Sequence, residues 1–418
     1  MVRDYHPDEK KKDNHTGNSG ENNRTNERST DNQEQASNAH FGRRSLLKAG
    51  AAAGLGIVGT TSLTELAAAS IDKSSNGKYD VWKITGKEVY DLSDGEKLSN
   101  ILVDQTADGA TLTIRSQNKS KWAVRNIGFL GVGQDGEGSS SFQFQVSTPS
   151  GGHGLIENIW ANGKARDGQS ASQLGGIYIR PSHEGHIDIR HTYIEGFGNN
   201  AVYASAVGKD GGNAGSVTLK NCYHRDNTVS QFRIGSPKSI VRNCVGVVND
   251  PDGKRGQYPS DGSYNARCVW GKHFRNQRIE NSSFYLSPND VNPDTVFEAR
   301  YIDDRSEGEQ AVVNAIGCNV NANAPQLQSS TSNATVNTTS LGKNPTVAVI
   351  GGGGVPLSPK MAASGNRSMP PELPGADGGN NSKNSTPSKA DGGNSSNDST
   401  EIKTECPKAQ PQRQSTEN

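Results

Sequence analysis

Aromatic and charged residues alternate with apolar ones in a series of short, strand-like segments between residues 176 and 300. If Ile177 and Ile179 point into a core, the side chains between them point outward, because side chains alternate across a strand. The same inward and outward alternation, applied to the later segments, gives one outward stripe. It consists of Tyr178, Arg180, Tyr203, Arg233, Trp270, Lys272, Glu298 and Arg300. Flat rings suit sugars, and Arg or Lys pairs with carboxylate or sulfate groups. We therefore expect a groove for an acidic polysaccharide, with substrate-binding roles for Tyr178, Arg180, Tyr203, Trp270, Glu298 and Arg300; an ordinary solvated sheet face is the alternative.

Four residues on or beside this stripe could carry out lyase chemistry. A uronan lyase removes a proton next to a carboxylate, and it needs a cation to neutralise that carboxylate and a base with a lowered pKa. The candidate catalytic residues are Arg233, Arg267, Lys272 and Asp261. A glycoside hydrolase needs two carboxylates about 5–10 Å apart, for which Asp261 with Glu298, or Asp303 with Asp304, are weaker candidates.

Two clusters could bind a metal ion. Asp250 and Asp252 lie in a long segment before residue 267 and could hold Ca²⁺ through oxygen ligands. Asp250-x-Asp252-Gly253 matches part of an EF-hand loop but lacks its 12-residue spacing, so turn formation is the alternative. The segment 183–191 contains His183, His186, Asp188 and His191, for which metal binding or acid–base chemistry competes with a structural role at a corner.

A recurring motif determines which elements position these residues. The motif consists of an apolar residue, then any residue, then Asn as its central residue. The central residues of successive copies are 22 to 38 positions apart. The copies are centred on Asn126, Asn158, His191, Asn221, Asn243 and Asn281, with a weaker copy at Asn314. Asn suits a corner, because it tolerates left-handed backbone and its side chain bonds neighbouring groups. Short β-rich segments lie between the copies, at 176–180, 201–204, 231–234, 268–272 and 296–300.

The two sets of segments predict a parallel β-solenoid whose coils stack about 4.8 Å apart. Such a cylinder needs few core residues per coil, which explains why only 31% of the residues are hydrophobic. On this coil pattern, residues from roughly 80 to 350 resemble the right-handed parallel β-helix, or pectate-lyase-like, superfamily. The resemblance implies an all-β, single-stranded right-handed parallel β-helix; a Greek-key β-sandwich is the competing fold. The chain contains no Arg-x-Pro-x-x-Arg stretch of the pectate-lyase type, so a non-catalytic carbohydrate-binding or adhesion protein is the alternative to a lyase.

The two ends differ from the middle. Residues 1–40 are polar and predicted to be disordered. Residues 41–69 contain Arg43-Arg44, an apolar stretch and a small-residue cleavage site, which predicts a twin-arginine signal and a secreted protein. We expect the β-helix domain over 70–350 and a low-complexity disordered tail over 351–418.

Charge and cysteine content narrow the function further. The 44 basic and 44 acidic residues cancel, which argues against a nucleic-acid partner. Apart from the signal segment, the chain has no apolar run long enough to span a membrane, so no stable span is expected after cleavage. Cys222 and Cys244 occupy equivalent places in consecutive coils, where they could form a disulfide or act as small buried residues.

Overall fold

The computed structural model describes residues 71–133, 142–163, 174–208, 212–236, 238–249, 266–273, 276–288, 295–300, 310–321, 323–324, 326–330 and 333–373. The expected N-terminal extension and signal, and the candidates Asp250, Asp252 and Asp261, lie outside these residues.

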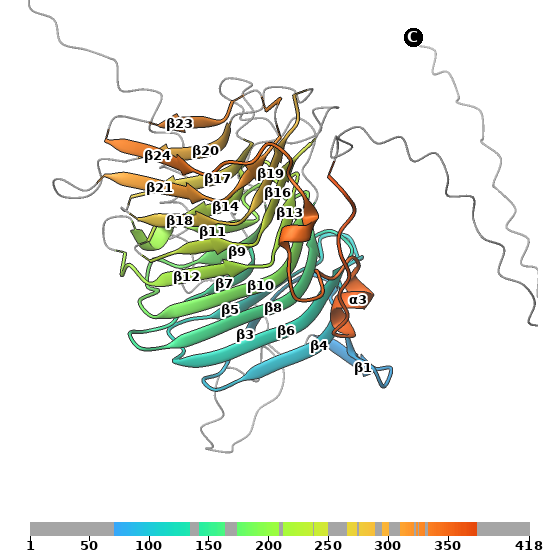
Figure 1. Cartoon of the computed structure of the whole chain (residues 1–418). Coiled ribbons are helices and arrows are strands. Elements are labelled where there is room, and N and C mark those ends of the chain that lie inside the picture. The colour runs from blue at the N-terminus through green and yellow to red at the C-terminus, as the bar shows by residue number, and fades with distance from the viewer. Residues whose placement is uncertain are drawn as a thin grey trace, which may run out of the picture. The chain divides into compact units, whose positions relative to one another are not determined.

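Nearly all the described elements are short strands in two sheets, which stack coil upon coil (Figure 1). Within the described residues, sheet A has 15 strands: β1 (Asp72–Ser75), β2 (Asp80–Lys83), β4 (Lys97–Asp104), β6 (Lys121–Leu130), β8 (His153–Asn162), β10 (His186–Glu195), β12 (Ser216–Lys220), β13 (Tyr223–Arg225), β15 (Ile240–Arg242), β16 (Val245–Val248), β18 (Gln277–Glu280), β19 (Ser283–Leu286), β21 (Ala311–Ile316), β22 (Asn319–Val320) and β24 (Ala334–Thr339). Sheet B has nine: β3 (Lys87–Asp91), β5 (Thr111–Ser116), β7 (Phe142–Val146), β9 (Gly175–Ile179), β11 (Val202–Ala204), β14 (Ser230–Ile234), β17 (Arg267–Lys272), β20 (Thr295–Arg300) and β23 (Gln328–Ser330).

The strands pair in parallel with the equivalent strand of the next coil; β1 and β2 pair antiparallel at one end. The chain alternates between the sheets, so β6, β8 and β10 are neighbours in sheet A although β7 and β9 separate them in sequence. This is the parallel β-solenoid that the repeat predicts. The internal strands predicted between the motif copies coincide with β9, β11, β14, β17 and β20 to within a residue.

The apolar position of the motif forms the core between the two sheets. Val124, Ile156, Ile189, Leu219, Val241 and Ile279 are register partners on successive coils, and each is fully buried. Burial of one such aliphatic side chain contributes about 1.5–3 kcal/mol. The stack therefore sets both the register of the coils and much of their stability.

The Asn position of the motif is a corner, as predicted. Asn126, Asn158, Asn221, Asn243 and Asn281 have φ between 45° and 58°, and His191 takes the same conformation. Neighbouring corners are bonded: Asn158 Nδ2 donates to Asn126 Oδ1 at 2.9 Å, and Asn126 Nδ2 donates to Asn100 Oδ1 at 2.7 Å. The prediction that a weaker copy of the motif is centred on Asn314 is wrong. Asn314 lies within β21, and Gly317, with φ of 62°, forms that corner.

Residues 341–373 form a strap along the outside of sheet A, so residues 351–373 belong to the folded part and not to the tail that was expected to begin at residue 351. Residues 374–418 of that tail lie outside the described residues. The strap contains the 3₁₀ turn η3 (Val347–Val349) and the helix α3 (Pro359–Ala363), and α3 packs beside β4, β6 and β8 (Figure 1). Asn158 Nδ2 donates to the Ala362 carbonyl at 3.2 Å. The Gly- and Pro-rich composition of this segment makes tight turns, while Val355, Ala362 and Leu373 supply buried anchors. A second 3₁₀ turn, η2 (Ala206–Gly208), follows β11.

Candidate functional site

The stripe predicted on the internal strands is brought together on sheet B. Tyr178, Tyr203, Arg233, Trp270 and Glu298 are successive register partners on β9, β11, β14, β17 and β20. Lys272 pairs with Arg300 in the same sheet. Arg180 follows β9, and its Nη1 donates to Gln145 Oε1 at 3.3 Å. The alternation argument therefore places these side chains correctly in relation to one another.

Much of the stripe is buried, in contrast to the open surface expected of a groove, whereas Tyr178, Arg180 and Arg300 stay partly exposed. Arg233, Trp270, Lys272 and Glu298 are between 1 and 6% exposed. They pack around the Trp270 ring, which has the guanidinium carbons of Arg233 and Arg267 each 4.3 Å from its centre and Lys272 Nζ at 4.7 Å. Cations are attracted to the face of an indole ring, and the attraction is strongest where water is excluded. The same rings and cations that suit a sugar acid therefore also satisfy one another.

Glu298 is the acidic member of this Trp270 cluster. Arg267 contacts its carboxylate, and Arg300 Nε lies 2.9 Å from Oε1. Burial alone would disfavour the charged carboxylate, but the two guanidinium groups hold the pKa of Glu298 below its usual value. Glu298 is thus a buried anion held by two arginines.

Most histidines of the sequence cluster have structural roles. His183 is buried and lies 3.1 Å from Thr148 Oγ1 and 3.0 Å from the Ser216 carbonyl, and burial lowers its pKa. His191 is the corner residue, and its Nδ1 donates to the Gly354 carbonyl of the strap at 2.8 Å. His224, which lies on β13, one coil after this cluster, is likewise buried between Thr192 and Gln231. These three histidines follow the structural alternative.

A charged face lies on sheet A, on the strands that precede the Asn corners; its cations reach solvent, whereas Glu280 is buried. One register row runs through the residue before each corner: Arg125, Glu157, Arg190, Lys220, Arg242 and Glu280. Lys97, Lys121, Asp188 and Arg278 point outward beside it. We call these ten residues the charged face; it holds seven basic and three acidic side chains.

The carboxylates of the charged face do not cancel its positive charge. Glu157 lies 3.2 Å from Arg125 and 3.1 Å from Arg190, and Glu280 contacts both Arg242 and Arg278. The four arginine side chains remain 40–49% exposed. Each of these two Arg–Glu–Arg groups therefore carries a net positive charge at the surface.

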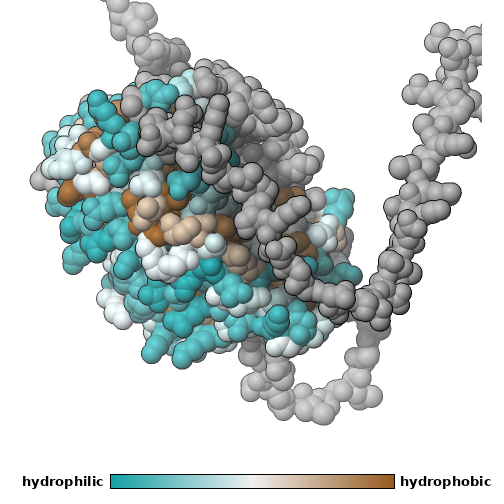
Figure 2. All heavy atoms as spheres, turned by 45° about the vertical axis from the view of Figure 1, so that its right-hand side comes forward, coloured by the Kyte–Doolittle hydropathy of each residue, from teal (hydrophilic) through white to brown (hydrophobic). Residues whose placement is uncertain are grey.

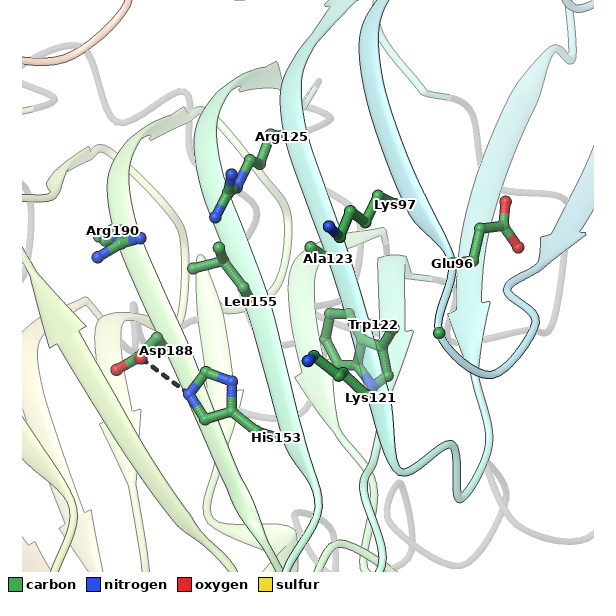
Figure 3. A pocket seen from close by; sticks show the side chains of 11 residues that line it. Glu96, Lys97, Lys121, Trp122, Ala123, Arg125, His153, Leu155, Asp188 and Arg190 are labelled. Carbon is green, nitrogen blue, oxygen red and sulfur yellow. Dashed lines mark hydrogen bonds and ion pairs between the residues drawn. The ribbon is translucent and has the colours of Figure 1, made fainter.

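A pocket of about 310 Å³ lies at the N-terminal end of the charged face (Figure 3). Lys97, Lys121, Arg125 and Arg190 line it, together with Trp122 and Leu155. Glu96 also lines it and accepts a hydrogen bond from Tyr90 Oη at 2.7 Å. His153 and Asp188 lie at one side of the pocket, and the His153 ring points toward the Asp188 carboxylate.

The charged face was not among the predicted sites, although the sequence contains a signal for it. In six copies of the motif, the residue directly before the corner is charged. Positions one, three and five before each corner share a strand face, so the motif places Lys121, His153 and His186 in one row.

Two further observations concern partners. Among the described residues, no helix has the length and apolar character needed to cross a membrane. The face of the described residues shown in Figure 2 is largely hydrophilic, and apolar residues form a patch near its centre and a few separate spots. Comparison with protein families, with curated proteins and with solved structures finds no match to this chain.

Proposed function

We propose that this protein binds an acidic polysaccharide along the charged face of its solenoid. The observation that carries the proposal is the set of exposed cations on successive coils of sheet A, from Lys97 and Arg125 to Arg242 and Arg278; only β8 among these coils contributes Glu157 in place of a cation. Parallel coils repeat about every 4.8 Å, so neighbouring cations on this face lie one or two coil spacings apart. A polymer with a carboxylate or sulfate on each sugar complements such an array.

The proposed polysaccharide-binding surface lies on sheet A, whereas the groove predicted from the sequence lies on the stripe of sheet B. Exposure supports sheet A, because a rigid polymer contacts side chains that reach solvent. Lys97, Lys121 and Lys220 are exposed, whereas Arg233, Lys272 and Trp270 are buried. The Tyr178, Arg180 and Arg300 side chains reach solvent in part and could extend the contact on the other sheet.

Charge reversal tests the proposal. In the Lys97→Glu/Lys220→Glu variant, we expect affinity for polygalacturonate to fall at least about tenfold, or about 1.4 kcal/mol. The matched control is Lys87→Glu/Lys343→Glu, which reverses two exposed lysines outside the charged face and changes net charge equally. Binding would be measured by calorimetry at two salt concentrations, with a neutral glucan as the reference polymer. Equal losses in both double variants would refute a role for this face.

A second candidate function is lyase-type cleavage of the same class of polymer. The observation that favours it is the convergence of Arg233, Arg267, Lys272 and Arg300 around Trp270 and Glu298. The burial of these side chains counts against direct access by a polymer. Incubation with a panel of uronans, with and without Ca²⁺, would show a rise in absorbance from the unsaturated product if the protein is a lyase. Binding without such a rise supports the non-catalytic function.

The proposal includes membership of the pectate-lyase-like superfamily and export through Arg43-Arg44. The parallel coils and the Asn corners support the first, and the motif at residues 41–69 supports the second. Replacing both arginines with lysine should leave the protein inside the cell, as fractionation would show. A Ca²⁺ site at Asp250 and Asp252 would depend on the loop outside the described residues.

A further inference from the structure

We propose that His153, His186 and Asp188 bind a divalent transition-metal ion of the zinc class. The three side chains come from adjacent parallel strands, β8 and β10, and all point outward from sheet A. His153 and His186 are register partners, and Asp188 lies two residues beyond His186 on the same strand face. Two coils of the solenoid therefore hold the three groups close together.

The donor atoms converge. His153 Nε2 lies 3.1 Å from one oxygen of Asp188, and His186 Nε2 lies 3.2 Å from the other. The ligand atoms of all three residues lie within 4.8 Å of one another. Tetrahedral ligands about 2.0–2.1 Å from zinc lie roughly 3.4 Å apart. A metal ion thus needs only small side-chain adjustments at this solvent-facing position.

A neighbouring group orients one of the imidazoles. His186 Nδ1 lies 2.8 Å from Ser216 Oγ, on the next coil. The two imidazole rings stack with their centroids 5.7 Å apart and their planes at 29°. Metal-binding histidines commonly have their second nitrogen hydrogen-bonded in this way, which fixes the ring. In the metal-free protein, these contacts therefore already orient the His186 ring with Nε2 toward Asp188.

The ligand set selects the kind of metal. Two imidazoles and one carboxylate suit zinc, iron(II) and related ions, whereas Ca²⁺ prefers oxygen ligands only. Three protein ligands leave at least one coordination position for water or for a bound anion. His153 and Asp188 line the pocket that also contains Lys97 and Lys121, so a carboxylate or sulfate in the pocket could take that position.

Zinc binding tests the inference without any polysaccharide. After EDTA treatment and dialysis, the full-length protein would be titrated with zinc chloride by calorimetry. We expect a site that is lost, or weakened at least about tenfold, in His153→Ala, His186→Ala and Asp188→Asn, and weakened about tenfold in Ser216→Ala. The control Lys87→Ala removes an exposed lysine from β3, on the other sheet, and should keep the affinity within about twofold.

Cobalt(II) provides a second readout. Bound cobalt should show a visible absorption spectrum of nitrogen and oxygen ligation that disappears in the histidine variants, while circular dichroism shows the same fold. Ca²⁺ at equal concentration should not displace it. Identical zinc titrations of the wild type and a folded His153→Ala variant would overturn the inference and leave Asp188 as a hydrogen-bond acceptor between two histidines. Because these titrations contain no polysaccharide, their failure is distinguishable from failure of the proposed function.

Discussion

At the residue scale, side chains of the same type differ in burial and in contacts according to their position on a coil. His186 reaches solvent and lies beside a carboxylate, whereas His183, three residues earlier, is fully buried between Thr148 and Ser216. Arginines show the same contrast. Arg190 lies on the exposed charged face, while Arg267 is buried against Trp270 and Glu298. Residue type and spacing therefore identify the candidates, and burial selects among them.

Glu298 provides a prediction at this scale. Glu298→Gln removes the carboxylate that pairs with Arg267 and Arg300, and breaking a buried pair costs about 3–5 kcal/mol. Because the pKa of Glu298 is held below its usual value, its contribution is present above the unfolded pKa of about 4.3 and is lost as the pH falls through the lower folded pKa. The difference in unfolding free energy between wild type and variant should therefore shrink in acid.

Urea unfolding at neutral and at strongly acidic pH would measure this difference. Glu372→Gln is the matched control, since it removes the same charge from an exposed position in the strap. A loss in Glu298→Gln that is equally large at both pH values would contradict the assignment of Glu298 as a charged, paired carboxylate.

At the scale of elements, the strap completes the outer side of sheet A. Trp160, Tyr193 and Tyr223 stack on successive coils, with ring centroids 6.3 Å and 5.2 Å apart. Val347, Ile350, Val355 and Leu373 of the strap pack against this aromatic stack. Polar contacts align the strap along several coils, from Thr346 N and Ser283 Oγ at 3.1 Å to Asn158 and Ala362. The strap thus ties several coils together.

Truncation tests the role of the strap. A chain that ends at residue 340 lacks these apolar anchors, each contributing about 1.5–3 kcal/mol when buried. We expect its Tm to fall by at least about 5 °C, and we expect the uncovered aromatic stack to bind a hydrophobic dye. A chain that ends at residue 376 keeps every described contact of the strap and should unfold like the wild type. If both truncated chains unfold at the same temperature, the strap contributes no stability.

At the scale of the whole molecule, one continuous core runs along the solenoid and contains its cysteines. Cys222, Cys244, Cys268 and Cys318 are free thiols with 0% exposure. Cys222 and Cys244 lie on neighbouring coils, as their places in the repeat predicted, but they act as small buried residues without a disulfide. Burial raises the pKa of the Cys244 thiol, which keeps it protonated and unreactive.

Thiol accessibility reports on the integrity of this core. In a Cys406→Ser background, we expect a thiol reagent to label none of the other four cysteines in the native protein and all four after unfolding in guanidinium chloride. Counting the labelled thiols by mass spectrometry would check this. Two unlabelled cysteines after unfolding without reductant would instead indicate a disulfide.

The neutral net charge conceals an uneven distribution that appears only at this scale. The 44 basic and 44 acidic residues cancel over the chain, yet the charged face holds seven basic and three acidic side chains. The sequence predicted a positive surface on the strands between the motif copies. The positive surface of the structure instead follows the residues that precede the Asn corners.

The repeat by itself determined the stacked parallel coils, because Val124 and Asn126 and their equivalents recur with the parity that a buried strand and a left-handed corner require. It also determined that Arg233, Trp270 and Glu298 are neighbours, since strands in register place equivalent residues side by side. Exposure was decided only by the tertiary structure. It depends on which segments cover a sheet, and those segments can be distant in sequence, as the strap is from β6 and β8. The repeat also places His153 and His186 in one row, but only the tertiary structure directs both Nε2 atoms toward Asp188, because side-chain orientation depends on contacts with the neighbouring coil, such as that of His186 with Ser216.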